Sequence, residues 1–293
     1  ALVYMVGESI FEDRLVRKIA KKLNIPLILY NCEGYRLVDL TQRRGIERLF
    51  YYVVEKSYAK ILSIASAVIY NCDYLKCRYQ QQYRHPECTI LAFNAAAFDT
   101  SAYVPAEKEM LSIVYFGNLG VGRVASLLEI ADAIHEIQSG QQIHIYGRPS
   151  EEDGERLKAH PAVVMHGFVS QDTLLQVRET ADILLHVESF DPQIMPKLKY
   201  AFSTKIAQCL CSGRCLLTYA PADTASTEYL MSTEAACVAT TKLEMRKKLQ
   251  SIMESAESRK KLADCGLKTA KENHDLRKTA KRIRAVIGAT YEN

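Results

Sequence analysis

The sequence has no apolar run near the roughly 18 residues that a membrane-spanning helix needs, and no strong excess of either charge. Its 38 basic and 34 acidic side chains leave a formal net charge of only +4. The nine cysteines are odd in number and irregularly spaced, without histidines at zinc-finger distances. These absences argue against a membrane-spanning protein, a disulfide scaffold, a zinc module and a nucleic-acid-binding protein. They favour a reducing, cytoplasmic environment.

What the sequence does contain is enough apolar surface for a folded core. Hydrophobic residues make up 48% and charged residues 25% of the 293 positions, which excludes wholesale disorder. The length predicts two domains or one large one. The chain starts with Ala-Leu-Val-Tyr-Met-Val, which reads as the middle of a strand and contains neither an initiator methionine nor a signal peptide.

Strand-length apolar runs alternate with helix-length amphipathic segments in the first part of the chain. We expect strands at 2–6, 26–30, 67–71 and 88–94, and helices at 11–24 and from about 44 to 66. Leu15, Ile19 and Leu23 lie on one side of the first of these helices. Strands rich in Val, Ile and Leu that alternate with helices indicate parallel βαβ units with both sheet faces covered.

The alternation stops at residues 95–110, which lack periodicity and contain Pro105, and then begins again. Further strands are expected at 112–117, 142–147, 162–169, 182–187, 215–221 and 236–240, with helices at 123–138, 151–158, 171–180, 203–212, 224–232, 241–256 and 257–272. This is the pattern of a second, complete doubly wound domain. We therefore predict an α/β protein with domains at 1–100 and 101–273, followed by a terminal helix at 274–293 that crosses back to the first domain.

The basic residues are concentrated in the first part of the chain. Residues 1–105 carry 14 basic and 10 acidic side chains, whereas residues 106–293 are neutral. The excess gathers around Arg36, Arg43, Arg44 and Arg48, next to an aromatic run at 50–52. Such a segment is either a solvated helix face beside a core stripe or a contact with an anionic membrane or ligand.

Two turns of the second predicted domain have the composition of anion-binding sites. A glycine-rich run at 117–122 follows a strand and precedes Arg123, and Ser203-Thr204-Lys205 begins a later helix. Glycines let backbone N–H groups approach a phosphate, and a helix N-terminus favours negative charge. Each turn also has a plain interpretation, as a tight turn or as a capping residue. Two such turns in one domain favour a diphosphate group as the ligand.

Two further positions follow predicted strands, where parallel sheets bind their ligands. His166-Gly167-Phe168-Val169 offers a short apolar backbone segment suited to an aromatic base, although a lone histidine is more often a buried structural residue. Glu33 follows the strand at 26–30. Its carboxylate is suited to accept hydrogen bonds from a sugar or to act as a base, unless it is a helix cap or a solvated loop acid.

Together these residues resemble the GT-B glycosyltransferases, in particular the retaining, nucleotide-sugar-dependent enzymes that build bacterial polysaccharides. The resemblance covers almost the whole chain and is strongest from Ile113 to Pro221. It implies two Rossmann-like domains facing a cleft, no essential metal, and Glu33, Arg123 and Lys205 as catalytic residues. It further implies a donor-binding set of Gly117, Asn118, Gly122, Arg123, Gly147, His166, Gly167, Phe168, Val169, Ser203, Thr204, Lys205 and Gln208.

The sequence departs from the family pattern where members carry two glutamates with seven residues between them. Tyr200 occupies the first position and Gln208 the second, where the family's glutamate binds the donor ribose. Asn118 also replaces an arginine of the diphosphate turn, and Arg123 replaces a lysine. An amide oxygen still accepts a bond from a ribose hydroxyl, so the departures are compatible with a divergent enzyme.

The resemblance implies a cytoplasmic glycosyltransferase, peripheral at the inner face of the membrane, that uses a UDP-sugar or a GDP-sugar and a glycan or lipid-linked acceptor. A non-catalytic nucleotide-sugar or glycan-binding subunit and a GT-B nucleotide-sugar epimerase are the alternatives. The basic segment around Arg36, Arg43, Arg44 and Arg48 is the expected membrane contact. With about four strands in residues 1–95 where relatives have six or seven, we also expect an amino-terminal domain that lacks its first βα units.

Overall fold

The computed structural model describes residues 1–37, 39–99, 103–105 and 107–290. The chain forms two compact units, each with its own parallel sheet. Unit 1 contains Ala1–Asn94, Tyr200–Phe202 and Leu276–Asn293, and unit 2 contains Ala95–Lys199 and Ser203–Asp275. Each unit is described by itself below.

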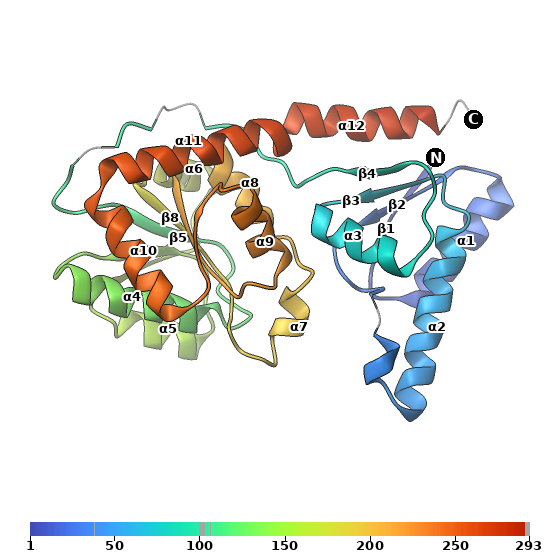
Figure 1. Cartoon of the computed structure of the whole chain (residues 1–293), viewed down its shortest axis with the longest axis horizontal. Helices are drawn as coiled ribbons and strands as arrows, with labels where there is room; N and C mark the ends of the chain where they lie inside the picture. The colour runs from blue at the N-terminus through green and yellow to red at the C-terminus, as the bar shows by residue number, and fades with distance from the viewer. Residues whose placement is uncertain (38, 100–102, 106, 291–293) are drawn as a thin grey trace. The chain divides into compact units, whose positions relative to one another are not determined.

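Unit 1 is built on four parallel strands in the order β1-β2-β3-β4 (Figure 1). Continuous runs of Val, Ile and Leu form the two central strands, which are buried because helices cover the sheet. The strands are β1 (Leu2–Met5), β2 (Leu27–Asn31), β3 (Ala67–Tyr70) and β4 (Thr89–Leu91). The helices are α1 (Ile10–Leu23), the 3-10 turn η1 (Leu40–Gln42), α2 (Gly45–Leu62), α3 (Asp73–Gln82) and α12 (Leu276–Ala289).

The apolar side of α1 does not join the core of unit 1. Leu15 and Leu23 expose 58% and 60% of their surface, and Ile19 also stays exposed. β1 is an edge strand, and the residues of α1 that are buried are Asp13 and Ala20. Periodicity therefore predicts the helix correctly, but it does not identify the face of the helix that packs.

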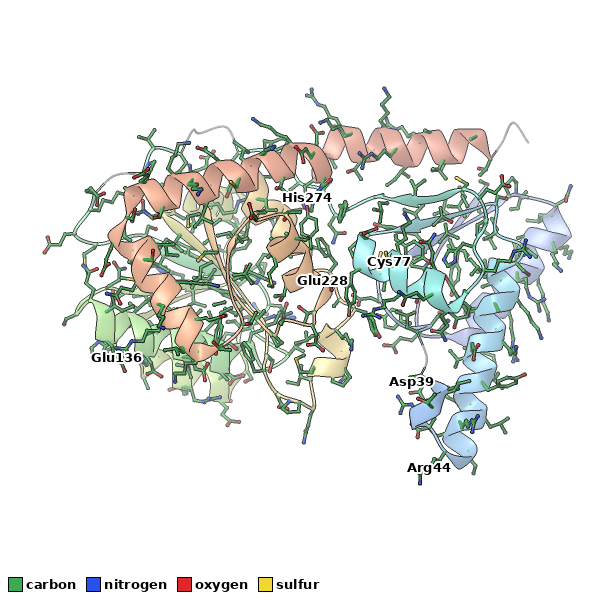
Figure 2. All side chains as sticks on the ribbon, in the orientation of Figure 1. Asp39, Arg44, Cys77, Glu136, Glu228 and His274 are labelled. Carbon is green, nitrogen blue, oxygen red and sulfur yellow. The ribbon has the colours of Figure 1, made fainter. Side chains whose placement is uncertain are left out.

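Arg36 is not part of a basic surface, which corrects the expected membrane contact. Its side chain is 1% exposed, and its Nε donates to Asp13 Oδ2 at 3.0 Å. The same guanidinium also donates to the carbonyl oxygens of Glu8 and Ser9 at 2.9 and 3.1 Å. Five donors in a rigid fork suit such a buried site. Arg44, by contrast, is exposed at the N-terminal end of α2 (Figure 2).

Unit 2 contains six parallel strands in the order β10-β9-β8-β5-β6-β7. The strands are β5 (Ile113–Phe116), β6 (Ile143–Tyr146), β7 (Val163–Gly167), β8 (Ile183–Val187), β9 (Cys215–Tyr219) and β10 (Cys237–Ala239). The helices are α4 (Arg123–Ile137), α5 (Glu151–Lys158), α6 (Gln171–Thr180), α7 (Met195–Leu198), α8 (Thr204–Cys211), α9 (Ala225–Ser232), α10 (Lys242–Glu254) and α11 (Ala256–Asn273). The strand order reverses between β5 and β8, which creates a topological switch point.

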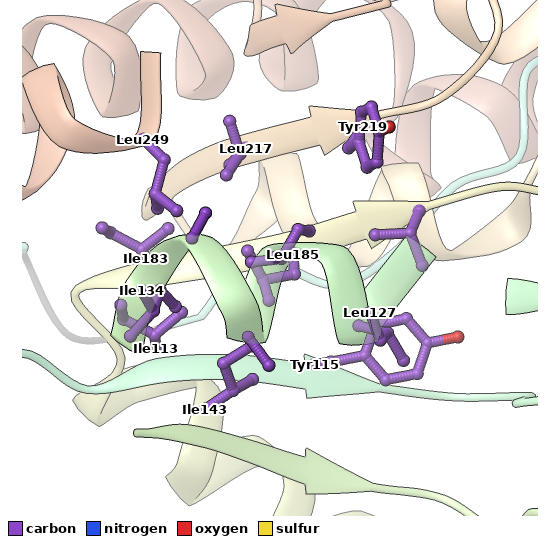
Figure 3. Close-up of a cluster of buried hydrophobic side chains, with 14 of the residues drawn as sticks. Ile113, Tyr115, Leu127, Ile134, Ile143, Ile183, Leu185, Leu217, Tyr219 and Leu249 are labelled. Carbon is purple, nitrogen blue, oxygen red and sulfur yellow. The ribbon is translucent and has the colours of Figure 1, made fainter. Parts of the chain in front are cut away.

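The core of unit 2 consists mainly of aliphatic side chains from the sheet and from the helices that cover it, together with Tyr115 and Tyr219 (Figure 3). Ile113, Ile183 and Leu217 come from three neighbouring strands and are fully buried. Leu127 and Leu249 add the apolar faces of α4 and α10. This packing fixes the carboxyl ends of β5 and β8, where the turns with candidate functional residues begin.

The segment between β8 and α8 differs from the expected loop because it contains the short helix α7. Pro196 lies in the first turn of that helix, a position where proline's missing N–H costs nothing. Within the described parts of the chain, no helix is both long enough and apolar enough to cross a bilayer.

Candidate active site

The turn between β5 and α4 brings the backbone close to neighbouring side chains. Gly117 has φ +125° and Gly122 has φ +70°, a region that favours glycine. A Cβ on Gly122 would lie 2.5 Å from Ser189 Oγ, and one on Gly117 would lie 2.8 Å from Lys205 Cε. The glycines thus allow the β5–α4 turn, the end of β8 and the start of α8 to meet at the switch point.

Lys205 lies in the first turn of α8 and reaches over Gly117. Its Nζ is 4.0 Å from the centre of the Tyr115 ring and 6.0 Å from that of Phe116. The Nζ is buried and has no hydrogen-bond partner. Burial lowers the pKa of Lys205 to about 8, and the charge of Arg123 adds to this effect. An unpartnered buried cation at the end of a parallel sheet is suited to bind an anion.

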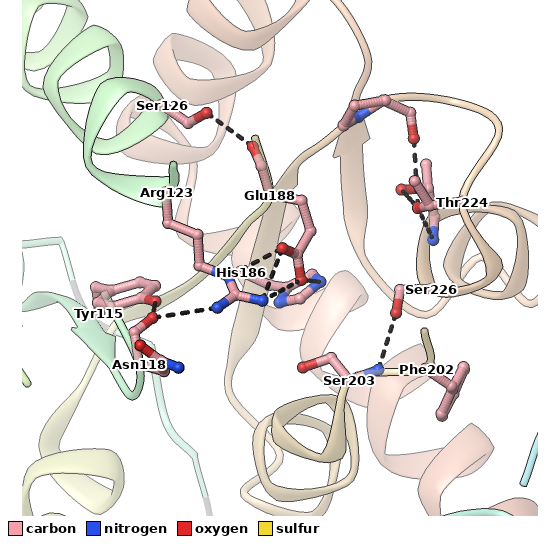
Figure 4. Close-up of polar contacts among 12 residues, drawn as sticks. Tyr115, Asn118, Arg123, Ser126, His186, Glu188, Phe202, Ser203, Thr224 and Ser226 are labelled. Atoms are coloured by element: carbon pink, nitrogen blue, oxygen red, sulfur yellow. Dashed lines mark hydrogen bonds and ion pairs between the residues drawn. The ribbon is translucent and has the colours of Figure 1, made fainter. Parts of the chain in front are cut away.

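Arg123, the first residue of α4, forms a two-pronged pair with Glu188 (Figure 4). Its Nε donates to Glu188 Oε2 at 2.9 Å, and its terminal nitrogen donates to Oε1 at 3.1 Å. Ser126 Oγ donates to the Glu188 carbonyl oxygen at 2.7 Å and holds this segment against α4. Burial raises the pKa of Glu188, whereas Arg123 and Lys205 oppose that effect. Arg123 is therefore largely neutralised, and Lys205 is the cation available at this site.

His186 lies in β8, two residues before Glu188, and its side chain is buried. Neither of its ring nitrogens has a hydrogen-bond partner, and its Nε2 is 3.8 Å from Glu188 Oε1. Burial lowers the pKa of His186 well below its usual value, and the charges of Lys205 and Arg123 act in the same direction. The imidazole is therefore neutral at physiological pH.

The turn after β7 presents an aromatic surface. The ring of His166 stacks on Tyr146 with 4.3 Å between ring centres and 4° between planes. His144 Nδ1 and His166 Nε2 are 3.0 Å apart, and burial lowers the pKa of both histidines. Phe168 is 77% exposed, and the Arg148 guanidinium lies 5.9 Å from its ring centre. His166 is thus an exposed stacking residue.

Gly147 connects this aromatic surface to the β5–α4 turn. A Cβ there would overlap the carbonyl oxygen of Gly117, so the close approach of the turns after β5 and β6 requires glycine. β5, β6 and β7 are adjacent strands, so the turns that follow them are neighbours at the carboxyl ends of the sheet.

The remaining predicted residues of unit 2 lie on or next to α8 and β7. Thr204 is exposed and Gln208 and Val169 are half-buried. Ser203 precedes α8 but its side chain caps no backbone N–H. The Ser203 hydroxyl is therefore not used by the helix. The backbone N–H of Ser203 donates to Ser226 Oγ at 3.0 Å. Gln208 lies one turn after Lys205 on the same helix.

Glu33 belongs to unit 1 and follows β2 at its carboxyl end. Its carbonyl oxygen accepts a bond from Tyr79 at 3.1 Å, which fixes the loop. Burial raises the pKa of Glu33 to about 7. The next residue, Gly34, lies against the ring of Tyr200, which a Cβ on Gly34 would approach within 2.6 Å. Tyr200 thus packs as an aromatic side chain against the loop after β2.

A model of the family described as glycosyl transferase-like matches residues 125–285, more than half of the chain. The chain belongs to this glycosyl transferase-like family. A sequence comparison with curated proteins gives no significant match.

Solved glycosyltransferase structures share the fold of this family member. The Anabaena HepE complex with UDP aligns at a TM-score of 0.73 and 12% identity, covering 98% of this chain and 78% of HepE. WaaG, a glycosyltransferase of lipopolysaccharide biosynthesis, aligns at 0.60 and 14% identity, covering 87% and 76%. Sucrose-phosphate synthase from Thermosynechococcus elongatus aligns at 0.66 and 12%, covering 99% and 74%. The predicted α/β class with a GT-B fold is confirmed.

Sequence reasoning missed several residues of this glycosyltransferase-like site. His186 lies near the end of β8, Glu188 follows the strand directly, and the ring of Tyr115 lies next to Lys205 Nζ. A histidine inside an otherwise apolar strand, followed by a glutamate just after the strand, was the available signal for the first two. No pattern in the sequence indicates that Arg123 pairs with Glu188, because the partners are 65 positions apart. Among the described residues, no group of three His, Cys, Asp or Glu side chains is placed to hold a metal ion.

Proposed function

We propose that this protein transfers a sugar from a nucleoside diphosphate donor to a glycan or lipid-linked acceptor, with retention of anomeric configuration, in cell-surface polysaccharide biosynthesis. Family membership supports the transfer reaction. Neighbours of the same fold support the donor class, since HepE has been crystallised with UDP and with UDP-glucose. WaaB, a lipopolysaccharide outer core galactosyltransferase of the same fold, supports the acceptor class.

The observation that carries the proposal is the buried, unpartnered ammonium of Lys205 above Gly117. A diphosphate placed at this turn would supply the missing hydrogen-bond acceptors. The N-termini of α4 and α8 add their dipoles at the same edge of the sheet. As the bond to the sugar breaks, negative charge grows on the leaving diphosphate, and these groups stabilise it without reorganisation.

In this proposal Arg123 also binds the diphosphate. It acts mainly as an oriented hydrogen-bond donor, because Glu188 compensates most of its charge. Glu188 already occupies two of its donor positions. One terminal nitrogen still faces the turn, 3.5 Å from the carbonyl oxygens of Asn118 and Gly120. The Glu188 pair therefore fixes the guanidinium beside the turn that would hold the phosphates.

The nucleoside would lie along the turns after β6 and β7. The backbone at 166–169 would contact the base, with the stacked His166 and Tyr146 rings beside it. Gln208 would accept a hydrogen bond from the ribose, and the hydroxyls of Ser203 and Thr204 would contact phosphate. UDP is the nucleotide we propose first, and GDP is the second choice.

Glu33 is our candidate on the acceptor side. With its pKa raised to about 7, its carboxyl group both accepts and releases a proton near neutral pH, as a group acting on an acceptor hydroxyl must. A second candidate function is a non-catalytic nucleotide-sugar-binding subunit. It is favoured by Tyr200 and Gln208, which stand where the resemblance places the two glutamates.

A thermal-shift series with UDP, GDP, ADP and CDP tests the donor site. We expect UDP to raise the melting temperature most, and Lys205→Met to reduce its affinity about ten-fold or more, because a charge-assisted contact is lost. Lys197→Met, a lysine on the neighbouring α7, is the matched control and should keep the shift. Equal shifts in wild type and Lys205→Met would refute the diphosphate site. Tight UDP binding without transfer or hydrolysis of any UDP-sugar would favour the binding subunit.

A further inference from the structure

The strand β8 contains a buried histidine, His186, that the proposed transfer reaction does not use. Ile183, Leu185 and Val187 of this strand pack in the core of unit 2. Since side chains alternate along a strand, His186 points to the opposite face of the sheet, where α8 packs against β8. Its side chain is 1% exposed, and within the described part of the chain neither ring nitrogen has a hydrogen-bond partner. Nearly all buried polar groups in proteins are paired, so this imidazole needs an explanation.

Two neighbouring side chains are unpaired in the same way. Thr218 lies opposite His186 on β9, and its buried hydroxyl oxygen has no hydrogen-bond partner among the described residues. Lys205 comes from the first turn of α8, and its buried ammonium has none either. Three elements thus bring unpaired polar groups together beside the switch point. The hydroxyl of Thr218 does not titrate near neutral pH, so a change of charge among these three groups falls on His186 or Lys205.

The charges around His186 keep its imidazole neutral in the free protein. Burial lowers the pKa of His186, and the positive charges of Lys205 and Arg123 lower it further. Glu188 is an anion at 3.8 Å from Nε2, but its carboxylate already accepts two hydrogen bonds from Arg123. Cys209, one turn after Lys205 on α8, adds no charge because burial raises the pKa of its thiol to about 12. At pH 7 these neighbours together therefore carry one excess positive charge.

A bound nucleoside diphosphate sugar reverses this balance. The two phosphates of its diphosphate linkage each carry one negative charge, and the proposed contact with Lys205 places them beside these groups. Lys205 compensates one of the two charges, so the excess changes from positive to negative. A nearby anion favours the charged form of a histidine, and the low dielectric of a buried site strengthens the effect. Protonation of His186 is then favourable instead of costly.

We propose that His186 takes up one proton from solvent when the nucleotide sugar binds, and that the resulting imidazolium compensates the charge of Glu188. The proton adds to the unprotonated ring nitrogen, and Nε2–H then donates to Glu188 Oε1. Glu188 shares its charge between two cations in that state, so Arg123 keeps more of its positive charge for the diphosphate. His186 is thus a positioning residue, which acts on the ligand through Glu188 and Arg123. This inference rests on the diphosphate site of the proposed function.

Isothermal titration calorimetry with UDP-glucose tests the proposal, with GDP-glucose in its place if GDP gives the larger thermal shift. Titrations at pH 6.5 in PIPES and in bis-Tris, which differ in ionisation enthalpy, give the number of protons taken up. The diphosphate of a nucleotide sugar has no group that titrates near this pH. Lys205, with a pKa of about 8, is already protonated there. We therefore expect His186 to account for an uptake of about half to one proton per bound nucleotide sugar.

Two histidine variants show where the proton goes. His186→Leu suits an apolar strand, and we expect it to abolish the uptake and to weaken binding at pH 6.5 about five-fold, because Arg123 is then less available to the diphosphate. His135→Leu, at an exposed histidine of α4, is the matched control and should change neither quantity. Nitrogen-15 NMR of the imidazole side chains adds a measurement on wild-type protein. One buried histidine should change from neutral to protonated when the nucleotide sugar is added.

The outcomes separate this proposal from the diphosphate site on which it rests. Binding without proton uptake, or uptake that persists in His186→Leu, would overturn the proposal and leave the diphosphate site in place. An imidazole that stays neutral in the complex would also overturn it and make His186 a structural residue of β8. If wild-type protein bound neither nucleotide sugar and showed no thermal shift with UDP or GDP, the diphosphate site and this proposal would both fall.

Discussion

The ammonium of Lys205 is held where its charge is costly to the folded protein. Its folded pKa of about 8 lies below the usual value of 10.5, so between these values the unfolded chain binds more protons than the folded one. The free energy of unfolding should therefore rise with pH across this window. We expect Lys205→Met to raise that free energy at pH 7 by on the order of 1–3 kcal/mol and to remove this part of its pH dependence.

Urea denaturation at pH 7 and pH 9.5 measures this effect, with Lys197→Met as the control. A substitution that stabilises the fold and weakens UDP binding is the signature of a cation kept for a ligand. A loss of stability in Lys205→Met at pH 7 would instead make Lys205 a structural residue of α8.

Residue types and their order predict Lys205 and Arg123 as site residues, but they do not predict the surroundings of these side chains. Both stand at helix starts after glycine or hydroxyl turns, and local patterns reveal such positions. The pairing of Arg123 with Glu188 and the burial of Arg36 against Asp13 depend on contacts between distant segments. A single sequence contains no period that reports such contacts.

At the scale of elements, the turns after the strands depend on glycine where two backbones meet. Gly147 faces the Gly117 carbonyl so closely that no Cβ fits. We expect Gly147→Ala to lower the free energy of unfolding by about 1–3 kcal/mol, as overpacking does, and to weaken UDP binding because the β5–α4 turn must move.

Gly288→Ala is the matched control for Gly147→Ala, because nothing lies within 4 Å of a Cβ built there. Gly288 is inside α12, where alanine is the better helix former, so this change should stabilise slightly. Chemical denaturation and UDP titration of both variants check the prediction. If Gly147→Ala behaved like Gly288→Ala, the close contact between the two turns would not exist in solution.

Element types follow from the sequence because the strands are continuous Val, Ile and Leu runs and the helices are amphipathic. The faces that pack do not follow as directly. Leu15 and Leu23 satisfy a helical period yet stay exposed on α1, and the cations of α2 that line a groove with α1 are Lys56 and Lys60 rather than Arg43. Periodicity specifies which side chains share a face, whereas the neighbours of a helix decide whether that face is covered.

At the scale of the whole chain, unit 1 takes up Tyr200–Phe202 and the segment from Leu276 onward, both distant in sequence from its sheet. The sequence predicts the return of the terminal helix to the first domain, but no pattern in it indicates that a segment as short as Tyr200–Phe202 joins unit 1. Tyr200 illustrates this, because its ring packs against Gly34, which is more than 160 positions earlier in the chain and belongs to unit 1.

Because every proposed donor contact belongs to unit 2, UDP should protect that unit first. In hydrogen exchange, we expect UDP to slow the amides of the β5–α4 turn and of the first turn of α8. At a UDP concentration one hundred times Kd, bound UDP should raise the free energy of any opening motion that releases it by about 2.7 kcal/mol. The amides of α1 and α2 serve as the internal reference and should be unchanged. Lys205→Met should lose the protection of both unit 2 turns together, since one diphosphate would order both. Protection confined to unit 1, or protection that persists in Lys205→Met, would move the nucleotide away from the switch point of β5 and β8.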